Sequence, residues 1–176
     1  MKKLVSVFCL TLLLFTARTA SAQAEIDKGD VLLNLGLGLG YYYGGGGTSF
    51  TASAEWAINN YISIGPYIGF ATSSYHSAGY KYSYTFFDIG ARGSYHFSQH
   101  ISNLPEQLDL YGGVGLGYVA SSYDSDYNGA YDDNYPGTVR GSLFGGARWY
   151  FSEKFAVNVE LGVGYAPLLL GVTFKL

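Results

Sequence analysis

The sequence predicts an all-β protein, an eight-stranded antiparallel transmembrane up-and-down β-barrel, and three observations support this. Segments of about ten residues alternate between an apolar, aromatic or Gly position and a polar one, as strands do when successive side chains face lipid and lumen. Turn-forming residues separate these segments. Nearly every charged residue falls in the set opposite the apolar set of its own segment. A helix would instead show a period near 3.6 residues.

The N-terminus predicts export. Lys2 and Lys3 precede an apolar run from Leu4 to Phe15, and Ala20-Ser21-Ala22 follows, as in a secretory signal peptide. We expect a signal peptide over 1–22 and one outer-membrane barrel domain over 23–176. The apolar run is shorter than the roughly twenty residues that span a bilayer. The single cysteine, Cys9, lies inside this run, so we expect no disulfide and no Cys-based metal site.

Composition excludes several function classes. The formal net charge is −3, and loss of the signal peptide would remove three basic residues and no acids. An acidic chain without basic clusters is a poor nucleic-acid binder, so we expect no nucleic-acid partner. The mean hydropathy of +0.11 is modest, but a barrel needs only half of each strand to be apolar. Nothing in the sequence predicts a cofactor.

Four strands are expected in the first half of the chain, each ending at a turn signal. The first, 29–42, ends at four consecutive glycines, 44–47, and the second, 49–58, ends at Asn59-Asn60. The third, 61–75, and the fourth, 80–97, enclose a short connection at 76–79. A longer connection follows at 98–107. We expect the glycine repeats at 36–40 and 113–117 to make space on the lumen side, since no helix follows either.

Four more strands complete the barrel at 108–122, 138–151, 155–165 and 168–176. They are separated by a long segment, 123–137, by the turn 152–154 and by Ala166-Pro167. An even number of strands places the N- and C-terminal ends of the chain on the same side, the periplasm for this class, so the first, third, fifth and seventh connections face outward. The connection 98–107 is therefore periplasmic and 123–137 is extracellular.

The position of charged residues tests the register, because a slip of one residue would move a whole strand's side chains to the other face. Only Lys81 shares parity with its strand's apolar set. The residues on the lumen parity are Asp30, Glu55, Asp88, Arg92, Asp109, Arg140, Arg148, Glu160 and Lys175. A soluble ligand-carrying barrel would reverse this arrangement and is disfavoured, because only lipid would exclude charge from the outward face.

Aromatic residues form two predicted bands on the lipid face, as expected for rings at the headgroup level. The periplasmic band comprises Trp56, Tyr95, Phe97, Trp149, Phe151 and Phe155, and the outer band comprises Tyr41, Phe50, Phe70 and Tyr118.

A cluster of lumen charges is the first candidate site. Eight strands enclose a lumen just wide enough to be filled by side chains. We expect charge pairing across the lumen near its periplasmic end, which would form either a gated polar path or, as we favour, a structural plug. The residues of this cluster are Glu55, Asp88, Arg92, Arg148 and Glu160.

The outer segment 123–137 is the second candidate site. Its tyrosines recur every four residues, and tyrosines supply contact area at low entropic cost. We expect the segment either to contact a ligand outside the cell or to be a solvated loop without a partner. Its candidate residues are Tyr123, Asp124, Asp126, Tyr127, Asn128, Tyr131, Asp132, Asp133 and Tyr135.

The same segment contains the first half of a calcium loop. Asp124, Asp126 and Asn128 supply oxygen ligands at alternate positions, and Gly129 suits the turn. The twelfth position holds Tyr135 in place of the usual bidentate Glu, so a solvated acidic loop is favoured over a metal site.

A short motif raises the alternative of catalysis. His100-Ile101-Ser102-Asn103 resembles the His-x-Ser-Asn motif of outer-membrane lipid A deacylases, in which His and Ser act as base and nucleophile. Glu106 is the nearest carboxylate that could orient the His. The motif covers four residues on the periplasmic side, so we expect no enzyme. We assign no role to His76 or His96, since no nucleophile pattern adjoins either.

The C-terminus carries a family resemblance. Gly171-Val172-Thr173-Phe174-Lys175-Leu176 resembles the assembly signal of bacterial outer-membrane barrels, although Leu176 replaces the usual terminal aromatic residue. With the signal peptide and eight strands, the mature chain is similar to the small outer-membrane barrels of OmpX or OmpA type, also called porin-like. The resemblance implies location in the outer membrane, contact with membrane lipid and the outer-membrane assembly machinery, and an envelope-structural or surface-recognition role. A small-solute channel is the main alternative.

Overall fold

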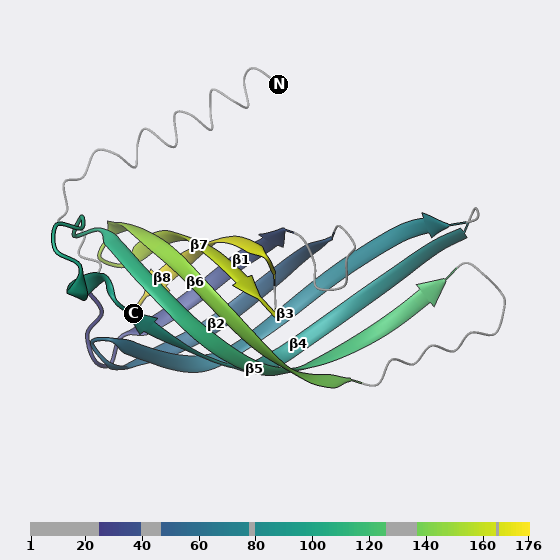
Figure 1. The fold of residues 1–176 in the computed structure, drawn as a ribbon, viewed down its shortest axis with the longest axis horizontal. Helices are drawn as coiled ribbons and strands as arrows, with labels where there is room; N and C mark the ends of the chain where they lie inside the picture. Colours follow the sequence, from purple (N-terminus) through teal and green to yellow (C-terminus); the bar gives the residue numbers. More distant parts are fainter. Residues whose placement is uncertain (1–24, 40–46, 78–79, 126–136, 165) are drawn as a thin grey trace, which may run out of the picture.

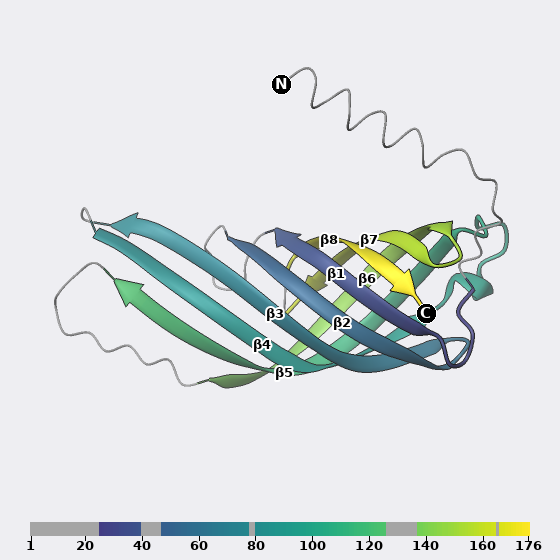
Figure 2. The same cartoon turned by 180° about the vertical axis from the view of Figure 1, so that it is seen from behind.

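The computed structural model describes residues 25–39, 47–77, 80–125, 137–164 and 166–176, and these form one closed antiparallel barrel (Figures 1 and 2). The eight strands follow chain order around the barrel, and the last pairs with the first. The predicted fold class is confirmed. No helix among the described residues is long and apolar enough to cross a membrane.

Each expected strand is present, with ends displaced by a few residues. The first strand begins at Val31 because a turn precedes it, in which the amide of Asp27 donates to Asp30 Oδ2 at 3.0 Å. The strands are β1 (Val31–Leu39), β2 (Thr48–Asn59), β3 (Ile62–Ser77), β4 (Tyr80–His96), β5 (Leu108–Ser125), β6 (Thr138–Ser152), β7 (Phe155–Val163) and β8 (Leu168–Lys175).

The barrel wall is much taller on one side. Strands β3, β4 and β5 have 16, 17 and 18 residues, whereas β1, β7 and β8 have 9, 9 and 8. The long strands project together at the end opposite the turns β2–β3 and β6–β7 (Figures 1 and 2). We call these two ends the outer and the periplasmic end.

The predicted outer boundary of the fifth strand, at residue 122, is wrong, because β5 continues along the tall wall to Ser125. Tyr123 and Asp124 are predicted in the outer loop, but both belong to β5, where they pair with Tyr84 and Ser83 of β4. The physical reason is that β4 itself continues outward, and its backbone groups need partners that β5 supplies. The outer connection is accordingly shorter at this end than 123–137.

The outward face of the barrel is apolar and the inward face holds the charges, as the alternation predicts. On β7, Val159 is 38% exposed whereas its neighbour Glu160 is 6% exposed. The large side chains that face outward between the two ends include Leu35, Ile64, Ile68, Ile89, Val114, Leu116, Leu143, Leu161 and Leu170. A belt of large apolar side chains around the barrel would be unfavourable in water, whereas the hydrocarbon of a membrane would cover it.

Aromatic side chains lie outward near both ends. Trp56, Tyr95, Trp149 and Phe151 are exposed near the periplasmic end. Phe50, Phe70 and Tyr118 are exposed toward the outer end, while Tyr41 lies outside the described residues. The two groups fit the predicted interfacial bands.

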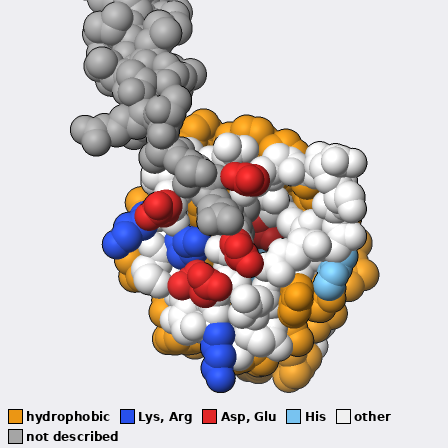
Figure 3. Space-filling model, turned by 90° about the vertical axis from the view of Figure 1, so that its left-hand side faces the viewer, with side chains coloured by type: hydrophobic (Ala, Val, Ile, Leu, Met, Phe, Trp, Pro, Cys, Tyr) orange, Lys and Arg blue, Asp and Glu red, His pale blue; other side chains and the backbone are white. Residues whose placement is uncertain are grey.

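The segment before β1 folds over the periplasmic end. Ile26 is buried against Leu32 and Ala57, and Lys175 Nζ donates to the carbonyl oxygen of Glu25 at 2.8 Å. The connection 98–107 begins with a 3₁₀ turn, η2 (Ser98–His100). Figure 3 looks onto this end, where acidic side chains surround the mouth and apolar side chains form the rim.

Candidate functional site

The periplasmic half of the lumen is filled by hydrogen-bonded polar and charged side chains, which we call the lumen plug. Every member occupies a lumen-facing position of its strand, and all except Arg92 are buried. The plug comprises Asn34, Glu55, Ser63, Arg92, Ser94, His96, Asp109, Tyr111, Arg148, Asn158, Glu160 and Thr173.

Glu55 of β2 is the main acceptor of the plug. Its Oε2 accepts hydrogen bonds from Ser63 Oγ at 3.0 Å and Ser94 Oγ at 2.6 Å. Its Oε1 accepts one from Asn34 Nδ2 at 3.0 Å and lies 3.2 Å from Arg92 Nε. A fully buried carboxylate is costly unless its lone pairs are satisfied, and here donors from three other strands satisfy them.

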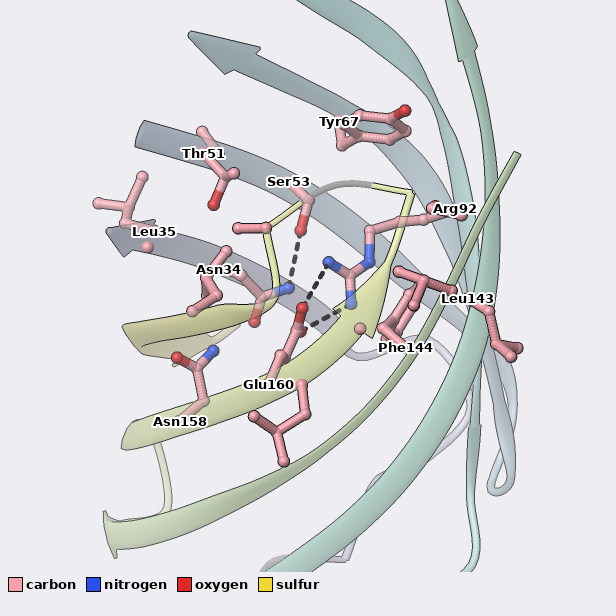
Figure 4. Close-up of a pocket in the computed structure, with 18 residues that line it drawn as sticks. Asn34, Leu35, Thr51, Ser53, Tyr67, Arg92, Leu143, Phe144, Asn158 and Glu160 are labelled. Carbon is pink, nitrogen blue, oxygen red and sulfur yellow. Dashed lines mark hydrogen bonds and ion pairs between the residues drawn. The ribbon is translucent and has the colours of Figure 1, made fainter. Parts of the chain in front are cut away.

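Arg92 joins opposite walls of the lumen. Its Nη2 lies 2.8 Å from Glu160 Oε1, its Nη1 lies 3.3 Å from Glu160 Oε2, and the resulting fork is seen in Figure 4. The guanidinium carbon lies 4.0 Å from the ring centre of Phe144, and the Tyr111 hydroxyl donates to Glu160 at 2.9 Å. This pair therefore bridges β4 and β7, which are not neighbours in the barrel.

Arg148 of β6 is the second cation and is completely buried. Its Nη1 donates to Asp109 Oδ2 at 3.0 Å, and its Nη2 lies 3.7 Å from Glu55 Oε1. Its guanidinium carbon lies 3.9 Å from the ring centre of Tyr111. Removal of such a cation would leave the buried carboxylates of Glu55 and Asp109 with less compensation.

His96 belongs to the plug, although no nucleophile pattern adjoins it in the sequence to predict a role. Its Nδ1 lies 3.0 and 3.1 Å from the two oxygens of Asp109, and its Nε2 lies 3.0 Å from Ser63 Oγ. The order Ser–His–Asp resembles a hydrolase triad. The Ser63 hydroxyl, however, is buried and bonded to Glu55, which favours a structural pairing.

Asp88 does not join the other four predicted lumen charges. It lies four positions before Arg92 on β4, which corresponds to roughly 13 Å along a strand. The Tyr67 hydroxyl donates to its Oδ1 at 3.1 Å. The expectation that Asp88 pairs within the periplasmic cluster is therefore wrong, whereas Glu55, Arg92, Arg148 and Glu160 are brought together.

A cavity of about 40 Å³ lies on the outer side of the Arg92–Glu160 pair (Figure 4). At roughly 10–15 Å³ of such volume per water molecule, it has room for a few waters. Asn158 Oδ1 is buried beside it without a hydrogen-bond partner, so we expect an ordered water there. The cavity is too small for an organic solute.

A larger pocket, of about 310 Å³, lies at the periplasmic mouth. His96 and Asp109 line it, together with Glu25 and Glu106 from the segments that fold over this end. This pocket therefore connects the periplasmic side to the lumen plug at His96.

The deacylase-like residues are not assembled into a catalytic arrangement. His100 Nε2 lies 2.7 Å from the Tyr95 hydroxyl, and its ring stacks on Tyr61 with 5.0 Å between ring centres. Within the described part of the chain, no hydrogen bond or ion pair joins His100 to Ser102 or Glu106, and all three are exposed.

The predicted surface loop is only partly described. Tyr123 and Asp124 are strand residues, as noted above. The remaining candidates lie outside the described residues: Asp126, Tyr127, Asn128, Tyr131, Asp132, Asp133 and Tyr135. The suggested calcium ligands Asp126 and Asn128 are among these. No group of three or more His, Cys, Asp or Glu residues in the described segments is placed to hold a metal ion.

The chain matches no known family profile and no curated protein, but its fold is similar to solved bacterial outer-membrane proteins. Neisserial surface protein A has a TM-score of 0.62 and 15% identity, over 85% of this chain and 98% of that chain. OprG from Pseudomonas aeruginosa has a TM-score of 0.57 and 8% identity, over 89% and 99%. Ail, the attachment invasion locus protein of Yersinia pestis, bound to the heparin analogue sucrose octasulfate, has a TM-score of 0.54 and 12% identity, over 85% and 99%.

At these identities the likeness concerns the fold. It agrees with the closed barrel, the apolar belt and the aromatic bands, which are independent observations on this chain. The chain is therefore a small eight-stranded transmembrane β-barrel of the bacterial outer membrane, with the fold of proteins such as Neisserial surface protein A and Ail.

Proposed function

We propose that this barrel acts at its outer surface, in an envelope-structural or surface-recognition role, and does not conduct solutes. The observation that carries the proposal is the lumen plug. The guanidiniums of Arg92, mostly buried, and of Arg148, fully buried, cross-link carboxylates from different walls of the lumen. A conducting path would need these ion pairs to break, which is costly for buried charges.

The shape of the barrel supports an outward role. Strands β3, β4 and β5 are longer than the rest, and β5 carries the chain as far as Ser125, away from the periplasmic end. Loops on a rigid scaffold are common sites of binding. Ail, the attachment invasion locus protein of Yersinia pestis, and Neisserial surface protein A have this fold, which is consistent with such a role.

Any extracellular ligand is expected to differ from the sulfated analogue bound by Ail. The outer segment carries Asp126, Asp132 and Asp133, and it contains no Lys or Arg between Ser125 and Gly137. Like charges in close contact would repel a polyanion. We propose that tyrosines supply the contact area, so an uncharged or cationic surface is the expected partner.

The test is to replace 126–136 with a short Gly-Ser turn and measure binding of expressing cells to host matrix and to other cells. Folding should persist, because the β5–β6 ladder closes at Val119–Thr138, below the replaced segment. Two matched variants separate the contributions: Tyr127, Tyr131 and Tyr135 changed to Ser, and Asp126, Asp132 and Asp133 changed to Asn. Loss of binding in the first alone supports the proposal.

Planar-bilayer conductance of the refolded protein addresses the channel alternative. We expect no single-channel events. Steady conductance, together with normal cell binding after the loop replacement, would shift the preferred role to a small-solute channel.

We also propose cleavage after Ala22, which would start the mature chain at Gln23. Residues 1–22 lie outside the described part of the chain, but Ile26 is already buried against the barrel. Cleavage after Ala22 leaves Ile26 and its contacts with the barrel in the mature chain. Mass spectrometry of the outer-membrane form checks this, and retention of Met1 would contradict it.

A further inference from the structure

The buried charges of the lumen plug do not balance if His96 is neutral. Three carboxylates, of Glu55, Asp109 and Glu160, face two guanidiniums, of Arg92 and Arg148. An uncompensated buried charge is expensive. His96 is buried in direct contact with Asp109, so a proton on its ring would supply the missing positive charge.

The first ring nitrogen must carry a proton. His96 Nδ1 lies 3.0 and 3.1 Å from the two oxygens of Asp109. Asp109 also accepts a hydrogen bond from Arg148 Nη1 at 3.0 Å, and beside that guanidinium the carboxylate is ionised. An ionised carboxylate only accepts hydrogen bonds, so the bond to the imidazole requires Nδ1–H as donor.

The second ring nitrogen, Nε2, faces the Ser63 hydroxyl, whose single proton is donated to Glu55. Ser63 Oγ lies 3.0 Å from His96 Nε2 and 3.0 Å from Glu55 Oε2. A serine hydroxyl has one proton and two lone pairs. When that proton is donated to the Glu55 carboxylate, which can only accept, the Oγ lone pair requires Nε2–H as donor. Both ring nitrogens are then protonated.

The surroundings of His96 favour a cation. The neighbouring elements present one carboxylate in direct contact, a second carboxylate one hydroxyl away, and one cation that already binds Asp109. These groups are Ser63 of β3, Asp109 and Tyr111 of β5, Glu55 of β2 through Ser63, and Arg148 of β6 through Asp109. The 310 Å³ pocket that His96 and Asp109 line connects this group to the periplasmic mouth.

We propose that His96 is the third cation of the lumen plug, an imidazolium whose Nδ1–H donates to Asp109 and whose Nε2–H donates to Ser63. With this cation, the positive and negative charges of the plug balance. Without it, one buried negative charge is uncompensated and the hydrogen bond to Ser63 loses its donor, so the folded barrel is less stable. This inference is independent of the proposed surface role.

Nuclear magnetic resonance of the refolded protein in detergent micelles tests the protonation state directly. With ring-¹⁵N labelling, we expect two N–H protons on His96 at about pH 7, where an ordinary exposed histidine is mostly neutral. The chain has three histidines, so His96→Gln assigns the signal. A single ring proton on His96 at this pH would overturn the proposal.

The charge count makes a further distinction. Glu55→Gln removes one carboxylate and balances the plug without a proton on His96. We expect the His96 ring in this variant to show one N–H proton at about pH 7 instead of two. If the variant does not refold, Glu160→Gln makes the same change in charge farther from Ser63 and has the same expected outcome. Two ring protons in either variant would show that charge balance does not set the state of His96.

Discussion

The two halves of the lumen are built on the same alternating strands but differ in what fills them. The periplasmic half contains the lumen plug, with buried ion pairs that join opposite walls. In the outer half, small residues such as Gly36 and Ser49 lie among larger ones such as Tyr67 and Leu169, and the buried Asp88 carboxylate accepts a hydrogen bond from Tyr67. Backbone hydrogen bonds between neighbouring strands close the barrel around both halves.

This difference separates two tasks. Closure of the ladder satisfies the backbone in lipid, and it places no demand on which side chains point inward. The plug then fixes the walls relative to one another and blocks the lumen at one end. The outer half therefore remains free to differ in height and in loop length, which is where the long strands β3, β4 and β5 occur.

The largest effect should come from removing a plug cation. Arg148→Met would leave Glu55 and Asp109 buried with less compensation, at a cost of about 3–5 kcal/mol in the free energy of unfolding. Arg140→Met is the matched control on the same strand, in the outer half, and its side chain is only partly buried. Its electrostatic partner Asp88 also accepts a hydrogen bond from Tyr67, so we expect the smaller cost of about 1–2 kcal/mol. Equal losses of unfolding free energy in urea titrations would mean that the lumen plug contributes no more to stability than the outer half does.

A smaller effect should follow a charge on the lipid face. Val159→Arg places a cation on the outward face beside Asn158, which faces the lumen, and should cost roughly 2–4 kcal/mol. Loss of heat-modifiable mobility in a gel would report the failure to fold. Val159→Thr tests whether polarity alone is responsible and should retain that mobility. An arginine variant that folds like the parent would mean that the outward face is not in hydrocarbon.

The outer half should still be sensitive where its glycines are crowded. A Cβ atom at Gly117 would overlap the Tyr67 hydroxyl and lie 2.6 Å from Asp88 Oδ1, so Gly117→Ala should cost about 1–3 kcal/mol. At Gly141, on the lipid face, the nearest atom to an added Cβ would be 3.9 Å away. Gly141→Ala should therefore be neutral or slightly stabilising. Thermal unfolding in micelles compares the two, and a tolerated Gly117→Ala would show that the outer lumen has spare room.

The fold could be predicted because alternation is a local property of the sequence. Hydrocarbon excludes charge from one face, so parity alone places Glu55, Arg92, Arg148 and Glu160 inside the barrel. The same reasoning fails at the outer end of β5. Beyond the membrane neither face needs to be apolar, so the alternation that identifies a strand is lost. Tyr123 and Asp124 are therefore predicted in a loop, although they pair within β5.

The partners inside the lumen could not be predicted in the same way. Hydrogen bonds of His96 reach Ser63 and Asp109, which are 33 and 13 residues away in sequence and come from the strands on either side of β4. Their meeting depends on the register of two ladders, which no short motif encodes. Parity did carry a usable signal, because His96 continues the lumen-facing set of Asp88, Arg92 and Ser94.

The smallest effect is expected at the exposed periplasmic connection, outside the plug. The His100 ring is held against Tyr61 and the Tyr95 hydroxyl, and the described residues provide no carboxylate bonded to it. A base that activates a nucleophile needs the serine within hydrogen-bond reach and an orienting group behind it. We therefore expect the lipid A mass spectrum of expressing cells to match that of cells without the protein, and Ser102→Ala to change nothing. Loss of an acyl chain that depends on Ser102 would assign chemistry to this connection and would mean that the plug is not the only functional feature of the periplasmic end.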